Sequence, residues 1–286
     1  MKSVSLWVFA VLVVGLVIKV SKDQRVMRDC QENQARAVTS ASRMDVSEVA
    51  QTPVQTHEDP RTVPTPATTD HFKEVVSRED FDRLFPRRHP LYTYEGLLAA
   101  AKDFRAFGGV GSLSMRKREA AAFFANVAHN TDKLKHVREV DPVDTCCDVD
   151  KRDVAICARG KKYYMRGPGM LSGSINYRRA SFYLFGDSRL SQNPDLVEQD
   201  PVVVWKTALW FWFEPPPTPG FSAHDSVASE FAHTLGFGGT VNGFTWGWDC
   251  QPSMRDSLGR RVGYFLDFAR MLKTQPIGPN ECRHQT

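Results

Sequence analysis

Residues 200–217, DPVVVWKTALWFWFEPPP, predict the central element of the fold. Asp200 followed by Pro201 is a strong helix start, because a carboxylate can cap the first turn and proline is tolerated there. The residues that follow are apolar on nearly every side, interrupted by Lys206, and the prolines from 215 to 217 end the helix. A helix that is apolar all round is buried, so we expect it to run through the middle of the domain, with its tryptophans in the core.

Helical patterns also flank this stretch. Thr93 can cap a helix over 95–104, EGLLAAAKDF, and another is expected over 115–129. A further helix is expected over 260–272, where apolar residues recur at helical spacing. Few segments alternate with period 2, and residues 131–169 form a long irregular stretch with three cysteines. The sequence therefore predicts a mainly α domain with long loops.

The helix expected over 115–129 points an amide inward. Phe123 and Val127 lie on its apolar face, and Asn130 continues that face. Glu139, which can ionise, follows nine residues later. This spacing fits either one half of a catalytic pair or a polar helix end beside an unrelated glutamate.

The chain divides into three parts. Residues 1–20 contain an unbroken apolar run from Leu6 to Ile18, flanked by Lys2 and Lys19. That length suits a signal-peptide core or, with snorkelling flanks, an uncleaved signal anchor that attaches the chain to a membrane. Residues 21–76 are polar, without helix or strand periodicity, and are interpreted as a flexible stalk. We expect the globular domain to span 77–286, in the secretory pathway, either extracellular or anchored by one membrane pass.

Charge and cysteine usage exclude other classes. The net charge of +4 is modest, and no basic run is interleaved with aromatics, so we expect no nucleic-acid partner. The chain has six cysteines, an even number that favours disulfides in a secreted protein. Cys146 and Cys147 are adjacent and lack the spacing of a zinc site, so we expect no metal and no cofactor.

Five stretches resemble glycoside hydrolase family 19, the inverting chitinases. In order and spacing they cover most of the expected domain, and they are KREAAAFFANVAHNT (117–131), CARGKKYYMRGPGMLSGSINY (157–177), NPDLVEQDPVVVWKTALWFW (193–212), GFGGTVNGFTWGWDC (236–250) and RRVGYFLDF (260–268). The resemblance implies a lysozyme-like, two-lobed helical domain with a substrate cleft. It also implies disulfides joining Cys147 to Cys157 and Cys250 to Cys282, which leaves Cys30 and Cys146 over.

The resemblance places the catalytic pair at Asn130 and Glu139. In the family a glutamate at the first position is the general acid, and a second glutamate is the general base. Here the base position is kept as Glu139, whereas the acid is replaced by Asn130. An amide cannot give up a proton at accessible pH, and losing a general acid typically costs about 10²–10⁴-fold in rate. Asp132, two residues on, or a group on the substrate is the substitute acid that would restore activity.

Other family positions are divided between kept and changed. The resemblance makes Ser172 a water-positioning residue, and it makes Asn176, Arg261 and His129 substrate-binding or cleft residues. Three further cleft positions have changed relative to the family: Thr245 replaces asparagine, Trp246 replaces glycine and Asp249 replaces glutamate. Arg166 is expected to be structural.

These features together predict a chitinase-like protein that binds chitin or a related N-acetylglucosamine polymer, with hydrolysis weak or lost. Two alternatives stay open. One is an active chitinase that uses Asp132 as its acid, and the other is a non-catalytic module that binds carbohydrate or a protein partner.

Overall fold

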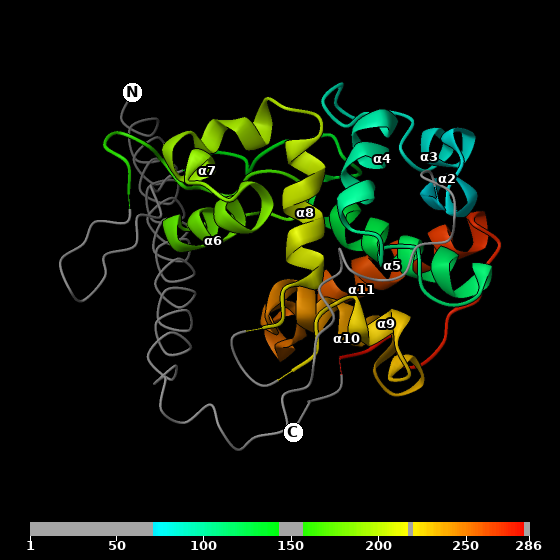
Figure 1. The fold of residues 1–286 in the computed structure, drawn as a ribbon. Helices are drawn as coiled ribbons and strands as arrows, with labels where there is room; N and C mark the ends of the chain where they lie inside the picture. Colours follow the sequence, from blue (N-terminus) through cyan, green and yellow to red (C-terminus); the bar gives the residue numbers. More distant parts are fainter. Residues whose placement is uncertain (1–70, 143–156, 217–219, 283–286) are drawn as a thin grey trace, which may run out of the picture.

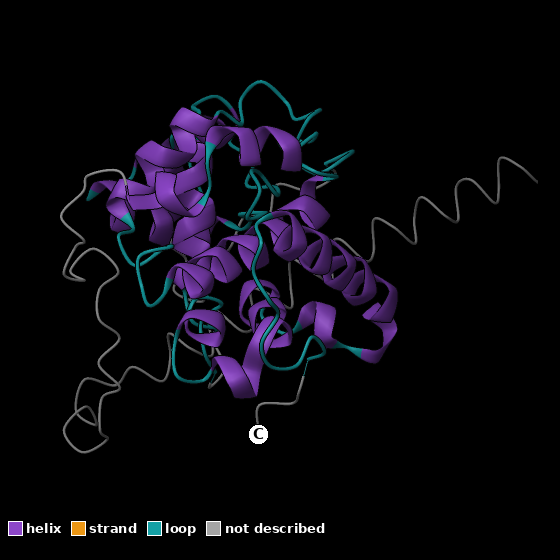
Figure 2. Cartoon of the chain, turned by 90° about the vertical axis from the view of Figure 1, so that its right-hand side faces the viewer, coloured by secondary structure: helices purple, strands orange, loops and turns teal. Residues whose placement is uncertain are grey.

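The computed structural model describes residues 71–142, 157–216 and 220–282, which form helices joined by loops (Figure 2). Two isolated β-bridges, both involving Arg166, are the extended pairings within the described ranges. The helices are α2 (His71–Val75), α3 (Arg78–Leu84), α4 (Tyr94–Asp103), α5 (Leu113–Thr131), α6 (Ser174–Phe185), α7 (Arg189–Gln192), η1 (Pro194–Glu198), α8 (Val203–Phe213), α9 (Asp225–Ala228), α10 (Ala232–Thr245), η2 (Trp248–Cys250), η3 (Pro252–Met254) and α11 (Arg255–Met271).

Helix α8 is the central element, as its sequence predicts. It stands between α6 and α7 on one side and α4 and α5 on the other (Figure 1), and it contacts α4, α6 and α10. Trp205 and Trp212 are fully buried, and Trp210 is 2% exposed. The helix begins at Val203, two residues later than a start at Pro201 would give. The Asp200 carboxylate still accepts hydrogen bonds from the first backbone N–H groups, those of residues 202 and 203.

Helix α5 packs its apolar face against α8. Phe123 lies edge-on to Trp212, with ring centroids 5.4 Å apart, and Phe124 is equally buried. Burying side chains of this size stabilises the fold by about 1.5–3 kcal/mol each. The helix spans 113–131 rather than 115–129, because Ser112 caps its start and Asp132 ends it in a left-handed conformation. Its last turn therefore carries Asn130 into the region between α8 and α11.

The other helix ends expected from the sequence lie close to those in the structure. Thr93 caps α4 as predicted, with its hydroxyl accepting from the Gly96 N–H. Helix α11 begins five residues before the predicted start at 260. Helix α2 falls within the range 21–76 that we interpreted as a stalk, with His71 and Phe72 buried, so the domain boundary at 77 is set too late.

One predicted disulfide lies within the described residues. Cys250 and Cys282 are joined, with their Cα atoms 5.5 Å apart, and the bond fastens the end of the described chain to η2. Cys157 is also disulfide-bonded, while its expected partner Cys147 lies outside the described residues, as do Cys30 and Cys146. The predicted N-terminal signal or anchor segment lies outside them too. In the part of the chain that the structure describes, no helix has both the length and the apolar character needed to cross a membrane.

Candidate functional site

A pocket of about 200 Å³ opens where α5, α8, α10 and α11 meet the loop before α6. Its lining includes six polar residues predicted for the site, which come from four separate stretches of the chain: Asn130, Ser172, Asn176, Thr245, Asp249 and Arg261. Trp246, also predicted, lies in its wall with Trp248, Phe211, Phe244, Met165, Gly169 and Met170. The tertiary structure thus gathers residues up to 131 positions apart into one site.

Arg261 is the centre of the polar network in this pocket. It is 4% exposed, and its guanidinium donates to the Asp249 carboxylate at 2.6 Å through Nε. One terminal nitrogen donates to the backbone and side-chain oxygens of Asn126, and the other donates to Oδ1 of Asn130 at 2.8 Å. A buried guanidinium whose three nitrogens all donate hydrogen bonds is rigid, so it fixes the Asn130 side chain in turn.

The Asn130 amide is held at both ends. Its oxygen accepts from Arg261, and its Nδ2 donates to the carbonyl oxygen of Pro168 at 2.9 Å. A position that supplies one donor and one acceptor suits either an amide or a protonated carboxyl group. An ionised carboxylate there would face the Pro168 carbonyl with a lone pair. The surroundings of residue 130 therefore match those of a neutral acid, although the residue present cannot release its proton.

Asp249 is occupied by other partners. It is 5% exposed, pairs with Arg261, and accepts a hydrogen bond from Ser257 at 2.9 Å. The same hydroxyl lies 2.9 Å from Nε2 of His129. Since Ser257 donates its single proton to Asp249, it must accept from His129, which places the imidazole proton on Nε2.

His129 lies behind the pocket rather than in its wall. We expect it to bind substrate; in the structure its Nε2 lies 2.9 Å from the Ser257 hydroxyl, and it is not among the residues that line the pocket. Burial, followed by the nearby Arg261 charge, lowers the pKa of His129 to about 4. The imidazole is therefore neutral at physiological pH.

Glu139 lies beside the pocket and does not line it. Its Oε1 accepts from the Met165 N–H at 3.0 Å, and its own N–H donates to the Met165 carbonyl oxygen at the same distance. Met165 is part of the lining, so the predicted base, Glu139, contacts a lining residue without lining the cavity itself. The neighbouring Arg166 is 1% exposed and pairs with Asp195 and Glu198, in keeping with the structural role predicted for it.

Asp132 points to solvent. Its carboxylate pairs with Lys135 at 2.6 Å, and this hydrogen bond lowers the pKa of Asp132. It is not among the residues that line the pocket. A general acid needs a raised pKa and access to the substrate, and Asp132 has neither.

Two polar groups face the pocket with unfilled capacity. The Oδ1 atom of Asn176 is buried without a hydrogen-bond partner, while its Nδ2 donates to the Ser172 carbonyl oxygen. No hydrogen bond to the Ser172 hydroxyl is recorded within the described part of the chain. A buried acceptor without a partner is costly, so Asn176 is prepared to accept an N–H or O–H from a ligand.

Sequence reasoning missed two members of the network, Asn126 and Ser257. Each lies four residues before a predicted site residue on the same helix, Asn126 before Asn130 and Ser257 before Arg261. Residues four apart share a helix face, so this spacing could have identified both. Phe211 was also missed as a pocket residue, because we expected the whole of that helix to be core.

Comparisons with known proteins agree with this geometry. The family model described as Chitinase class I, glycoside hydrolase family 19, matches residues 67–282. An endochitinase from Carica papaya is 33% identical over 242 residues, which cover 74% of this chain and 98% of the relative. The crystal structure of chitinase C from Streptomyces griseus is 36% identical with a TM-score of 0.65, covering 73% of this chain and 97% of that one. A class IV chitinase from Zea mays is 30% identical with a TM-score of 0.61, covering 73% and 98%. With the family model matched over its whole helical domain, this chain belongs to glycoside hydrolase family 19.

Proposed function

We propose that the pocket binds chitin-type chains of β-1,4-linked N-acetylglucosamine and that hydrolysis there is weak or absent. The relatives named above are chitinases, and this chain keeps their fold over nearly their whole length. At about 200 Å³ the cavity is smaller than the usual range for ligand pockets, about 300–1,000 Å³, so it suits one part of a polymer rather than a large free ligand.

The walls of the pocket support sugar binding. Trp246 stacks on Phe211 with ring centroids 5.1 Å apart, giving the cavity an aromatic side on which the C–H face of a pyranose can pack. The open acceptor of Asn176 and the hydroxyl of Ser172 lie among the lining residues. An acetamido N–H and sugar hydroxyls supply the donors that these groups lack.

The absence of a usable general acid supports the proposal that hydrolysis is weak or absent. Inverting hydrolysis needs a protonated carboxyl and an ionised carboxyl about 6.5–9.5 Å apart, on opposite sides of the bond that breaks. Asp249 is the one carboxylate among the described residues that line the pocket, and it is committed to a buried ion pair with Arg261. Asn130 has no proton to give, and Asp132 faces solvent. The leaving sugar oxygen would depart without protonation.

A repair experiment tests this proposal. We expect the wild-type chain to bind insoluble chitin and to cleave soluble chitin oligomers no faster than Glu139→Gln. Because the site already suits a neutral acid, Asn130→Glu is expected to raise cleavage by about 10²–10⁴-fold. The matched control is Asn130→Gln, which has the same length as glutamate but no acidic proton.

Brisk cleavage by the wild-type chain that Glu139→Gln abolishes would contradict the loss of activity. If that activity also fell in Asp132→Asn, the alternative acid would be established. Failure to bind chitin in any form would leave a protein partner as the function of the domain.

We also propose that the chain enters the secretory pathway. The apolar run from Leu6 to Ile18 and the Cys250–Cys282 disulfide support this location. Fractionation of expressing cells with protease protection tests it, and N-terminal sequencing of the mature chain distinguishes a cleaved signal from a membrane anchor. A full-length, reduced chain in the cytosol would overturn it.

A further inference from the structure

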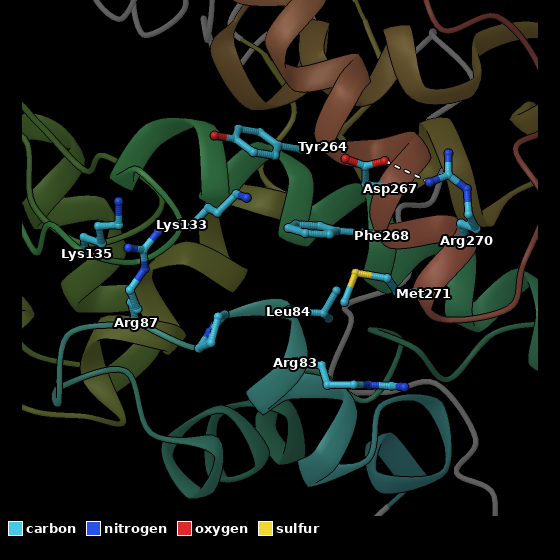
Figure 3. Close-up of a pocket in the computed structure, with 11 residues that line it drawn as sticks. Arg83, Leu84, Arg87, Lys133, Lys135, Tyr264, Asp267, Phe268, Arg270 and Met271 are labelled. Carbon is cyan, nitrogen blue, oxygen red and sulfur yellow. Dashed lines mark hydrogen bonds and ion pairs between the residues drawn. The ribbon is translucent and has the colours of Figure 1, made fainter.

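A second cavity, of about 250 Å³, lies between the end of α3, the turn after α5 and the C-terminal half of α11 (Figure 3). It shares no lining residue with the pocket described above. Five of its lining side chains are cationic, and they are Arg83, Arg87, Lys133, Lys135 and Arg270. We call this cavity the basic pocket.

The charges of the basic pocket do not balance. Three of its cations pair with carboxylates three residues away in sequence: Arg83 with Asp80, Lys135 with Asp132 and Arg270 with Asp267. For Arg87 and Lys133 no ion pair is recorded anywhere in the described ranges. The pocket therefore carries two positive charges in excess. A phosphate monoester has a charge of about −1.5 to −2 at pH 7, so one such group would neutralise them.

The backbone presents Lys133 to this pocket in an unusual conformation. Asp132, Lys133 and Leu134 have φ values of 48°, 59° and 62°, so three consecutive non-glycine residues are left-handed. Hydrogen bonds hold the turn: Lys133 N–H donates to the Ala128 carbonyl oxygen at 2.8 Å, and Leu134 N–H donates to the Thr131 hydroxyl at 2.9 Å. Backbone strain of this kind persists where the surroundings enforce it, often at ligand sites.

The other walls of the pocket are aromatic and apolar. Lys133 Nζ lies 5.3 Å from the centroid of the Tyr264 ring, which comes from α11. Figure 3 shows Lys133 and Arg87 entering from one side, with Leu84, Phe268 and Met271 across from them. The ring of Tyr264 and this apolar surface leave room for a sugar-sized group beside the cations.

The three walls are tied together before any ligand binds. The His89 N–H donates to the Leu134 carbonyl oxygen at 2.8 Å, which joins the loop after α3 to the strained turn. Phe85 lies edge-on to Phe268 of α11, with ring centroids 5.5 Å apart. Preorganised walls reduce the cost of ordering on binding, which favours a specific site over a loose basic surface.

We propose that the basic pocket binds a phosphate monoester on a sugar-sized group. Arg87 and Lys133 hold the phosphate oxygens by charge-assisted hydrogen bonds, and the Tyr264 ring packs against the attached group. This site is independent of the chitin pocket, since neither needs the residues of the other. The phosphate can come from a soluble sugar phosphate or from a lipid headgroup, and the chemistry of recognition is the same.

The full chain, checked for its fold by circular dichroism, is titrated with N-acetylglucosamine 6-phosphate by calorimetry, with N-acetylglucosamine as the neutral control. We expect binding of the phosphate alone, weakening as salt rises from about 50 to 200 mM. Arg87→Gln and Lys133→Gln are each expected to raise Kd about tenfold or more, as loss of a charge-assisted hydrogen bond predicts. Lys133→Gly removes the same charge while relieving the left-handed backbone, so it should lose binding equally without unfolding.

The matched control is the pair Arg159→Gln and Lys162→Gln, which removes the same charge from exposed positions outside the pocket. Binding to vesicles with and without phosphatidic acid distinguishes a lipid headgroup from a soluble sugar phosphate as the ligand. The site is supported if the wild-type chain binds either phosphate and the Arg87 and Lys133 variants do not. The proposal is overturned if no phosphate binds, if the neutral sugar binds equally, or if the control pair weakens binding as much as the pocket variants.

Discussion

Trp246 takes a conformation that favours glycine. Its φ is 49°, at the left-handed C-terminal cap of α10, and its ring is 7% exposed against Phe211. A non-glycine residue in this region costs about 1–3 kcal/mol. Burial of the indole offsets that cost, so the wall of the pocket around Asn130 keeps a bulky ring at a strained position.

Replacing Trp246 separates strain from burial. We expect Trp246→Ala to lower the free energy of unfolding by about 3–5 kcal/mol, because a buried indole is lost. Trp246→Gly should lose about 1 kcal/mol less, since glycine adopts the left-handed conformation without strain. Urea denaturation measures both, and an alanine variant as stable as the glycine variant would show that the cap is not strained.

His129 makes stability depend on pH. Its pKa falls from 6.5 to about 4 on folding, so the folded state disfavours the protonated imidazole. The contribution of neutral His129 to the free energy of unfolding is fully present above pH 6.5 and is lost as pH falls toward 4. We expect His129→Gln, which keeps an N–H donor for Ser257, to flatten the stability curve between these values. Equal slopes for the two proteins, measured by denaturant unfolding, would contradict this.

A buried carboxylate joins three helices of the domain. Glu119 of α5 is 0% exposed and accepts from the Gly108 N–H, from Trp212 Nε1 of α8 and from His224 at the start of α9. Burial opposes the charge of His224, but the ion pair with Glu119 raises the pKa of His224. This pair therefore stabilises the fold below pH 6.5, and its contribution is lost as pH rises through the raised pKa.

Removing one partner of this pair should leave the other charge unpaired. We expect Glu119→Gln to lower the free energy of unfolding by about 3–5 kcal/mol. His224→Gln removes the imidazole. We expect the double variant with Glu119→Gln to lose less free energy of unfolding than the sum of the losses in the two single variants. A double-mutant cycle by denaturant unfolding measures the coupling, and additive effects would show that the two residues do not interact.

Two of the longer helices, α6 and α10, were not predicted, and their packing explains why. Helix α10 contains Gly236, which has a φ of 55° and kinks the helix, and Gly238, where a Cβ would lie 1.9 Å from the Glu281 carbonyl oxygen. These glycines weaken the local helical signal, but they allow the C-terminal segment to lie directly on the helix. Helix α6 starts after Gly173 without a side-chain cap. In both, long-range contacts outweigh local propensity.

The C-terminal segment closes the domain by a covalent bond. The Cys250–Cys282 disulfide spans 32 residues, including all of α11, the helix that supplies Arg261 to one pocket and Tyr264 to the other. The segment also packs on α10, where Gly238 N–H donates to the Pro279 carbonyl oxygen at 3.0 Å. Both pockets therefore depend on the placement of α11.

Removing the disulfide is expected to weaken the whole molecule. For a loop of this length, loss of the cross-link should lower the free energy of unfolding by about 3–4 kcal/mol. We expect Cys250→Ser with Cys282→Ser to show this loss in urea unfolding, and the wild-type chain under reducing conditions to lose at least as much, because reduction also breaks the bond of Cys157. A further decrease when the double variant is reduced would report the bond of Cys157 separately.

The amino-acid sequence alone was enough to predict a mainly α domain around a buried α8, because apolar periodicity and capping residues act locally. It also placed Asn130 on the inward face of its helix and, by resemblance, opposite a glutamate at 139. Neither periodicity nor resemblance could tell that Arg261 and Pro168 hold the Asn130 amide, or that Glu139 bonds to the backbone of Met165 instead of lining the pocket. Those outcomes depend on side chains brought together from distant segments, whose contacts are decided by packing rather than by neighbours in the chain.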